Sequence, residues 1–145
     1  MFNQDFKEFF ESLNNNHVRY LVVGGYAVAF HGHPRYTKDI DIWVERSREN
    51  SRALILAIEQ FGMGSLGLME EDFLLPDQVI QLGCPPDRID ILVSITGVDF
   101  SECYPNRLEV ILNDVKINFI DLEHLKQNKK ASGRLQDLAD LKKLE

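Results

Sequence analysis

The first stretch of the chain, MFNQDFKEFFESLNNN, has apolar residues at intervals of three and four positions. This spacing puts their side chains on one stripe of an α-helix, which we expect to face the core. The stripe consists of Phe2, Phe6, Phe9, Phe10 and Leu13. The three asparagines at positions 14–16 favour an end to the helix. The pattern therefore predicts an N-terminal helix within residues 1–16.

Two apolar strands follow, with a pair of glycines between them. VRYLVV is apolar almost throughout, as in a buried strand. Gly24 and Gly25 then predict a tight turn, and YAVAFHG predicts a short helix before Pro34. In DIDIWVE, polar and apolar residues alternate, which indicates a second strand. The predicted order is strand, glycine turn, helix, strand.

A second long helix is expected after this strand. Ser47 or Ser51 can cap it, and Gly62 favours its end. Its apolar side carries Leu54, Ile55, Ile58 and Phe61. The segment 62–72 contains three glycines and has no clean period, so we expect an irregular loop there.

Residues 77–120 alternate between strand and turn patterns. DQVIQLG and RIDILVSI, joined by CPPD, predict one hairpin, and RLEVIL and VKINFI, joined by Asn113 and Asp114, predict another. Asp121 can then cap a helix that continues to Lys130. A last helix from Arg134 is expected to have an apolar stripe. This stripe consists of Leu135, Leu138, Leu141 and Leu144.

Together these elements predict an α/β (α+β) domain. We expect a mixed, mostly antiparallel β-sheet flanked by helices, in one domain that spans residues 1–145 and closes with helices over 121–145. The 145 residues are 44% hydrophobic, enough for a substantial core. Apolar runs are far shorter than the roughly 20 residues that cross a bilayer, and the N-terminus lacks a signal-peptide pattern. A cytoplasmic protein without membrane contact is expected.

Charge and cysteine content narrow the classes of function. The net charge of −7 argues against a surface that coats nucleic acid, although a local basic patch such as KQNKKASGR leaves RNA binding open. Cys84 and Cys103 do not form a CxxC pair, so thiols are favoured over a disulfide or a zinc site.

Two aspartates stand in the apolar strand DIDIWVE. Because side chains alternate between the faces of a strand, Asp39, Asp41 and Trp43 share one face and the isoleucines the other. The two aspartates are then about 6.5 to 7 Å apart at their Cα atoms. Unpaired, they would raise the pKa of each other, and a divalent cation would remove this cost.

A third aspartate repeats this pattern in RIDILV. Asp90 lies alone among apolar neighbours, on the face opposite Ile89 and Ile91. Three carboxylates without matching cysteines or histidines favour Mg²⁺ or Mn²⁺. Because Mg²⁺ usually takes its remaining ligands from substrate phosphates, a phosphorylated substrate is also favoured. Gly24 and Gly25 fit this interpretation, since backbone N–H groups at a helix N-terminus bind anions.

The ordered set of glycine pair, thirteen further residues, DxD and a later strand aspartate resembles the DNA polymerase beta-like nucleotidyltransferase superfamily. HGHPRYTKDIDI and NKKASGRLQDLADLKKLE are similar to small bacterial members of the abortive-infection and toxin–antitoxin type. The resemblance covers the chain from about Val18 to its end.

This resemblance implies a two-metal transfer of a nucleotidyl group from a nucleoside triphosphate (NTP) to an acceptor hydroxyl. Asp39 and Asp41 would hold both metals, and Asp90 would complete the site of the metal that activates the acceptor. Gly25 stands where many members have a serine, so only backbone donors would be offered there. Four cationic residues are candidates for binding the triphosphate, alongside Gly24 and Gly25. They are Arg35, Lys38, Lys129 and Arg134.

Several alternatives remain open at this stage. The aspartates could be surface residues, with Asp90 paired to Arg88, and the basic residues could pair with Asp137 or Asp140. A degenerate module that binds a nucleotide or a partner protein is the rival function, and a metal-dependent phosphoesterase is a third. The acceptor could be a tRNA, a protein or a small molecule such as an antibiotic. A cognate toxin or antitoxin protein would be the partner in a two-gene system.

Overall fold

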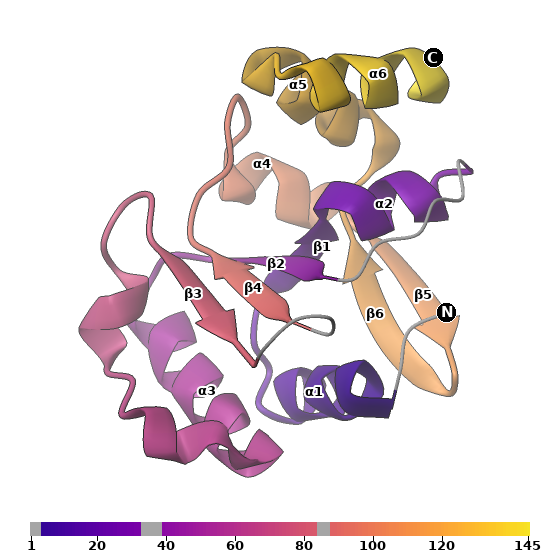
Figure 1. Ribbon diagram of the computed structural model, residues 1–145. Helices are drawn as coiled ribbons and strands as arrows, with labels where there is room; N and C mark the ends of the chain where they lie inside the picture. Colours follow the sequence, from indigo (N-terminus) through magenta and orange to yellow (C-terminus); the bar gives the residue numbers. More distant parts are fainter. Residues whose placement is uncertain (1–3, 33–38, 84–87) are drawn as a thin grey trace.

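The computed structural model describes residues 4–32, 39–83 and 88–145, and among these a single six-stranded sheet forms the centre of the protein (Figure 1). Its strands lie in the order β3-β4-β2-β1-β6-β5. Pairs β1–β2, β3–β4 and β5–β6 are antiparallel, whereas β1–β6 and β2–β4 are parallel. The prediction of a mixed, mostly antiparallel sheet is confirmed. The strands are β1 (Tyr20–Val23), β2 (Ile40–Val44), β3 (Val79–Leu82), β4 (Ile89–Leu92), β5 (Leu108–Leu112) and β6 (Val115–Phe119).

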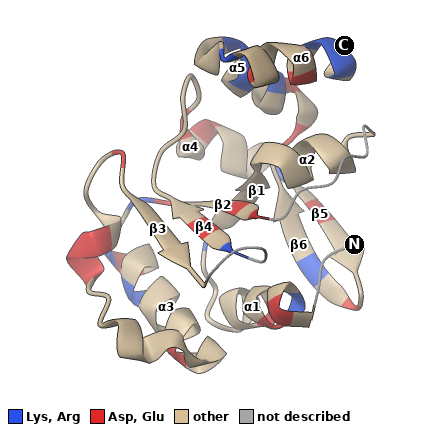
Figure 2. Cartoon of the chain, in the orientation of Figure 1, with Lys and Arg blue, Asp and Glu red and all other residues tan. Residues whose placement is uncertain are grey.

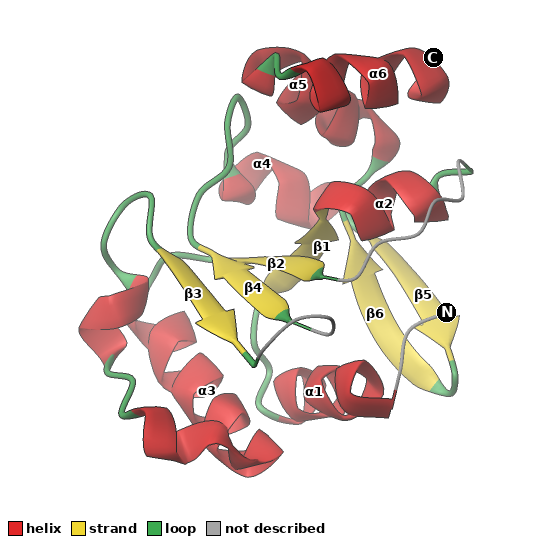
Figure 3. Ribbon diagram, viewed as in Figure 1, coloured by secondary structure: helices red, strands yellow, loops and turns green. Residues whose placement is uncertain are grey.

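Helices cover both sides of this sheet (Figure 3). α1 and α3 lie on one side, and α2, α4 and the pair α5–α6 gather on the other (Figure 1). The α-helices are α1 (Gln4–Asn15), α2 (Gly24–Phe30), α3 (Arg48–Ile58), α4 (Phe100–Cys103), α5 (Leu122–Ser132) and α6 (Leu135–Leu144).

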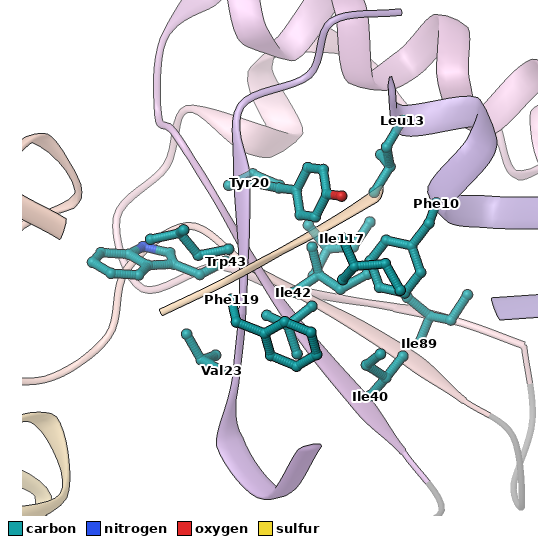
Figure 4. Packing of buried hydrophobic residues seen from close by; sticks show 14 of the residues in the cluster. Phe10, Leu13, Tyr20, Val23, Ile40, Ile42, Trp43, Ile89, Ile117 and Phe119 are labelled. Carbon is teal, nitrogen blue, oxygen red and sulfur yellow. The ribbon is translucent and has the colours of Figure 1, made fainter. Parts of the chain in front are cut away.

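The main core lies between the sheet and the helices α1 and α3. Phe6, Phe9, Phe10 and Leu13 of α1 are all buried there, which confirms the described part of the predicted stripe. Figure 4 shows Phe10 and Leu13 beside Ile42 and Ile117, with Trp43 on the other side of the strands. The isoleucine face of β2 is therefore the core face, and the aspartate face is turned toward α2 and α5–α6.

Most local predictions between the strands are confirmed. Ser47 caps α3 by accepting a hydrogen bond from the Asn50 backbone N–H (3.2 Å), and Asp121 caps α5 in the same way from His124 (3.3 Å). Asn113 and Asp114 both have positive φ angles, as the tight turn of the second hairpin requires. The CPPD turn of the first hairpin lies outside the described residues.

The end of α3 differs in detail from the prediction. α3 ends at Ile58, and a π-helical turn over Glu59–Met63 continues the chain to Gly62, whose φ of 102° breaks the helix. Short 3₁₀ turns at Gly64–Leu66 and Glu70–Phe73 follow within the expected irregular segment.

The apolar stripe predicted for α6 is wrong. Leu135 is 89% exposed and Leu138 46%, whereas Asp137, Asp140 and Leu144 are buried. An α-helix turns by about 100° per residue, so leucines spaced by three residues spread around it, and Leu135 lies about 180° from Leu144. Asp137 and Asp140 fall within about 40° of Leu144. The buried face of α6 is therefore largely acidic.

Two expectations about the whole chain can be compared with the described residues. Among them no helix is long and apolar enough to cross a membrane. Cys103 is a buried free thiol, and burial raises its pKa to about 12. Cys84 lies outside the described residues.

Candidate active site

Two of the predicted aspartates lie side by side at the centre of the sheet. β2 and β4 are parallel neighbours, and Asp41 is the direct cross-strand partner of Asp90. Neighbouring strands are about 4.8 Å apart, so the two carboxylates emerge together on the same face. The acidic segments of β2 and β4 are adjacent in Figure 2. Asp39, just before β2, shares this face by alternation.

Arg88 connects the outer two carboxylates. Its Nε donates to Asp90 Oδ1 at 2.8 Å, and its Nη2 donates to Asp39 Oδ2 at 3.0 Å and to Asp90 Oδ2 at 3.2 Å. The ion pair of Arg88 with Asp90, considered as an alternative from the sequence, is therefore present. Its second contact with Asp39 was not predicted, although the spacing in RID already put Arg88 and Asp90 on one face.

The carboxyl group of Asp41 has a raised pKa. Its pKa is raised from 3.8 to about 6, mainly by burial and also by the negative charges of Asp90 and Asp39. The positive charges of Lys129 and Arg88 act in the opposite direction. One guanidinium thus compensates the three carboxylates only in part.

The donor chemistry of this cluster fits a divalent cation. Within 4–32, 39–83 and 88–145, no three Asp, Glu, His or Cys side chains are already gathered as a metal site. Arg88 lies between Asp39 and Asp90 instead. Three carboxylates nevertheless outnumber the one guanidinium beside them, and carboxylates are the hard oxygen donors that Mg²⁺ and Mn²⁺ prefer. The residues fit these ions once Arg88 turns away.

The glycine pair forms the first turn of α2, rather than a turn that precedes it. Gly24 has a φ of 68°, and a Cβ at this position would collide with the Asp41 carboxylate. Val23 and Asp41 are direct partners in the β1–β2 ladder, which explains this close approach. A glycine at position 24 is therefore needed both for its backbone angle and for room beside Asp41.

A pocket of about 430 Å³ opens beside Asp41. Of the predicted site residues, it brings together Gly24, Asp41, Lys129 and Arg134. The end of β4 and the following loop add Leu92, Ser94, Ile95 and Thr96 to its wall, and α5 adds Asn128 and Ser132. Asp39, Asp90 and Gly25 do not line it. Arg35 and Lys38 lie outside the described residues, so their phosphate role stays a prediction.

Lys129 and Arg134 are both held by aspartates of α6. Lys129 Nζ lies 3.2 Å from Asp137 Oδ1 and 3.2 Å from Asp140 Oδ2. Arg134 Nε donates to Asp137 Oδ2 at 2.7 Å. Burial would raise the pKa of Asp137, but the hydrogen bonds from Arg134 and Lys129 lower it overall. The surface pairing considered from the sequence is thus present, although for Lys129 it is buried.

Trp43 packs within the protein on the aspartate face. Its ring meets the ring of Phe100 edge to face, with centroids 5.1 Å apart, and only 2% of the residue is exposed. It forms part of the wall between β2 and α4.

Comparison with known proteins gives a family match over nearly the whole chain. A family model described as "Nucleotidyltransferase of unknown function (DUF6036)" matches residues 3–145. A search of curated proteins gave no match in sequence.

Three solved structures are similar in fold. A provisionally assigned nucleotidyltransferase from Thermotoga maritima is 17% identical, with a TM-score of 0.63 over 95% of this chain and 88% of its own. The antibiotic-resistance factor ANT(2'')-Ia is 12% identical, with a TM-score of 0.59 over 97% of this chain and 80% of its own. The lincomycin-bound lincosamide antibiotic adenylyltransferase LnuA is 17% identical, with a TM-score of 0.57 over 99% of this chain and 96% of its own. At these identities the likeness is one of fold.

Proposed function

The chain belongs to the DUF6036 family of nucleotidyltransferases, and from that premise we propose that it moves a nucleoside monophosphate from an NTP to an acceptor hydroxyl in a metal-dependent reaction. One observation carries this proposal. Asp41 and Asp90 stand in register on neighbouring strands, and Gly24, at the start of α2, lies against Asp41 at the mouth of a pocket.

Asp39, Asp41 and Asp90 are the residues that would hold the divalent ions. When bound, Mg²⁺ or Mn²⁺ would neutralise triphosphate charge and lower the pKa of the acceptor hydroxyl. Asp41 is near both other carboxylates, because Asp39 lies two residues before it along the chain and Asp90 is its cross-strand partner. Arg88 pairs with both Asp39 and Asp90 and must leave at least one of them before all three aspartates bind a cation.

The pocket walls supply groups for the triphosphate. Backbone N–H groups at the start of α2 can donate to phosphate oxygens, and Lys129 and Arg134 add positive charge to the pocket lining. We include Arg35 and Lys38, in the segment before β2, in the same role. Holding the triphosphate in line with the acceptor hydroxyl is then the main contribution of the protein to the rate.

The acceptor can be a tRNA, a protein or a small molecule. LnuA is a lincosamide antibiotic adenylyltransferase and ANT(2'')-Ia is an antibiotic-resistance factor, which supports including an antibiotic among the small molecules. A toxin–antitoxin or abortive-infection role would instead supply a partner protein as acceptor or regulator.

Labelling with NTPs tests the reaction directly. Purified protein is incubated with each of the four α-labelled NTPs, Mg²⁺ and a cell extract, and we expect label on an RNA, a protein or a small molecule. The matched control is the double variant Asp39→Ala with Asp41→Ala, which should transfer nothing. Absence of label with all four NTPs, or equal labelling by the double variant, would refute the transfer.

A binding module that has lost transfer is the second candidate. The bridge from Arg88 to Asp39 and Asp90 favours it, because this cation occupies the position that a metal would need, and Gly25 offers no hydroxyl to the triphosphate. Calorimetric titration with Mg·NTP, followed by a pyrophosphate assay, separates the candidates. Tight binding without pyrophosphate release, in the presence of a cell extract, supports the module, and release excludes it.

A further inference from the structure

Helix α6 buries two aspartates where the sequence predicted leucines. Asp137 is 1% exposed and Asp140 0%, while Leu135 of the same helix is 89% exposed. Burial of an ionised carboxylate costs several kcal/mol unless partners compensate it, and an apolar replacement of such a cluster is often at least as stable. Stability alone is therefore a weak reason for this arrangement.

The two aspartates hold one ammonium group between them. Lys129 Nζ lies 3.2 Å from an oxygen of each, and the side chain of Lys129 is only 7% exposed. Each carboxylate is in turn fixed by a neighbour on its own helix or at its start. Gln136 Nε2 donates to Asp140 Oδ1 at 2.9 Å, and Arg134 Nε donates to Asp137 Oδ2 at 2.7 Å.

The chain geometry brings this cluster to the wall of the pocket. Gly133, with a φ of 66°, ends α5 in the left-handed conformation and turns the chain back into α6. Lys129 on α5 thereby faces the two aspartates of α6 and also lines the pocket that contains Asp41. Its positive charge is among those that lower the pKa of Asp41, so the ammonium lies within electrostatic reach of that carboxylate.

We propose that Asp137 and Asp140 are positioning residues, which hold the Lys129 ammonium in the wall of the pocket that Asp41 also lines, to meet the phosphates of the NTP. This inference rests on the proposed nucleotidyl transfer. A free lysine side chain has many rotamers, and ordering it upon binding weakens affinity. Two buried carboxylates fix the ammonium before the nucleotide arrives, while Asp137 and Asp140 themselves remain behind Lys129.

The first test separates binding from turnover. Asp140→Asn keeps the shape of the side chain and removes its charge, and we expect KM for Mg·NTP to rise about tenfold with kcat changed less than about threefold. Glu123→Gln is the matched control, because this α5 carboxylate is 81% exposed and lies 3.9 Å from its nearest cation. KM should be unchanged in the control. An unchanged KM in folded Asp140→Asn would refute the positioning role.

A double variant tests whether Asp140 acts through Lys129. Lys129→Met should raise KM at least as much as Asp140→Asn, and the combination of both should be no worse than Lys129→Met alone. If the fold-increases in KM of the two single variants multiply in the double variant, Asp140 does not act through Lys129. The double variant also removes one charge of each sign from the interior. It keeps the test usable if Asp140→Asn alone unfolds, as circular dichroism would show.

Chemical labelling gives a readout that does not depend on turnover. The protein is treated with an amine-acetylating reagent, and modification is read by mass spectrometry, with Lys142 and Lys143 of α6 as internal references. We expect Lys129 to be modified slowly in the wild type and several-fold faster in Asp140→Asn. Equal modification in both proteins would contradict the proposed restraint of the ammonium.

A non-hydrolysable NTP with Mg²⁺ separates failure of this inference from failure of the proposed function. Protection of Lys129 in a wild-type protein that shows no transfer supports the lysine site and refutes the reaction. If the wild type transfers the nucleotide and Asp140→Asn has the same KM, the proposed function is supported and the positioning role of Asp140 is refuted.

Discussion

Two charge clusters each contribute residues to the pocket, and they differ in charge balance. The strand cluster consists of Asp39, Asp41 and Asp90 with Arg88, so three carboxylates face one cation. The helix cluster consists of Asp137 and Asp140 with Lys129 and Arg134, so two carboxylates face two cations. The pKa of Asp41 is raised in the first, and that of Asp137 is lowered in the second.

This difference separates a cluster that needs a further cation from one whose carboxylates already have cationic partners. The strand cluster keeps an excess of negative charge, which a bound cation would relieve. The helix cluster satisfies its own charges and needs no further ion. The candidate metal site is therefore distinguished by its uncompensated negative charge rather than by its number of acidic residues.

The largest expected effect is on transfer by the strand cluster. Asp41→Asn removes the carboxylate that lies beside both Asp39 and Asp90, and loss of several kcal/mol of charge stabilisation would reduce kcat/KM about a thousandfold. Steady-state rates with Mg²⁺ measure this effect. A loss of less than about tenfold would contradict a metal role for Asp41.

A comparison of two glycines should give the next largest effect. Gly24 and Gly67 both have a φ of 68°, but a Cβ would meet Asp41 at Gly24 and nothing within 4 Å at Gly67. We expect Gly24→Ala to lower the free energy of unfolding by about 2 to 5 kcal/mol, from backbone strain and overpacking together. Gly67→Ala should cost about 1 to 2 kcal/mol from strain alone. Urea denaturation measures both, and equal losses would refute the close approach of Gly24 to Asp41.

The pH dependence of stability should show the raised pKa of the Asp41 carboxyl, which results mainly from burial and also from the charges of Asp90 and Asp39. Because the pKa of Asp41 is about 6 in the folded protein and its ordinary value is 3.8, the folded state binds this proton more tightly than the unfolded state. The free energy of unfolding should therefore fall as pH rises from about 4 to 6, and then level off. At about 1.4 kcal/mol per pH unit, the decrease from this group is at most about 3 kcal/mol.

Asp41→Asn is the control for this profile, since it should remove that decrease and be more stable than the wild type at pH 8. Urea denaturation across the pH range measures both proteins. A wild-type profile parallel to that of the variant would contradict the raised pKa.

Asp137 of the helix cluster should affect stability in the opposite direction, because its pKa is lowered in the folded protein. Its ionised carboxylate stabilises the fold at pH values above the ordinary pKa of an aspartate, and this contribution is lost as pH falls through the pKa of Asp137 in the folded protein.

Removal of the Arg88 guanidinium from the strand cluster should increase the affinity of the cluster for a metal ion. Arg88→Met frees Asp39 and Asp90, and we expect Mn²⁺ to bind about tenfold more tightly, by calorimetry. Arg48→Met is the control, because Arg48 pairs with Glu70 and Glu71 outside the cluster. Equal Mn²⁺ affinity in Arg88→Met and the wild type would mean that Arg88 does not compete with the ion.

The smallest effect is expected on the outer face of α6. Leu135→Gln should change the free energy of unfolding by less than about 0.5 kcal/mol, because Leu135 is 89% exposed. Thermal or urea denaturation measures it. A decrease of about 2 kcal/mol or more in the free energy of unfolding would mean that Leu135 is buried, as the apolar stripe predicted from the sequence requires.

Elements could be predicted from the sequence where the spacing of apolar residues and the type of the turn residues indicated the same structure. Alternation in DIDIWVE separated the core face of β2 from its aspartate face, and Asn113 with Asp114 identified the second hairpin. The resemblance drawn from the glycine pair and the three aspartates is confirmed at the level of family and fold. The roles of Asp39, Asp41 and Asp90 stay predictions.

Features that depend on contacts between distant segments could not be predicted in this way. The contact of Arg88 with Asp39 joins two strands that are neighbours only in the folded sheet. On α6, leucines at a strict three-residue interval suggested a stripe, but the turn of the helix carries Leu135 away from Leu144. The face of α6 that is buried carries Asp137 and Asp140, which form ion pairs with Lys129 of α5. This contact between two helices is not visible in the sequence of α6 alone.

Trp43 gives the protein a built-in optical reporter. It is the sole tryptophan of the chain, lies two residues after Asp41 on the same face of β2, and is 2% exposed against Phe100. Indole fluorescence shifts to longer wavelength when the ring passes from an apolar surrounding into water. Unfolding of every variant described above can therefore be followed through one native chromophore, without a label.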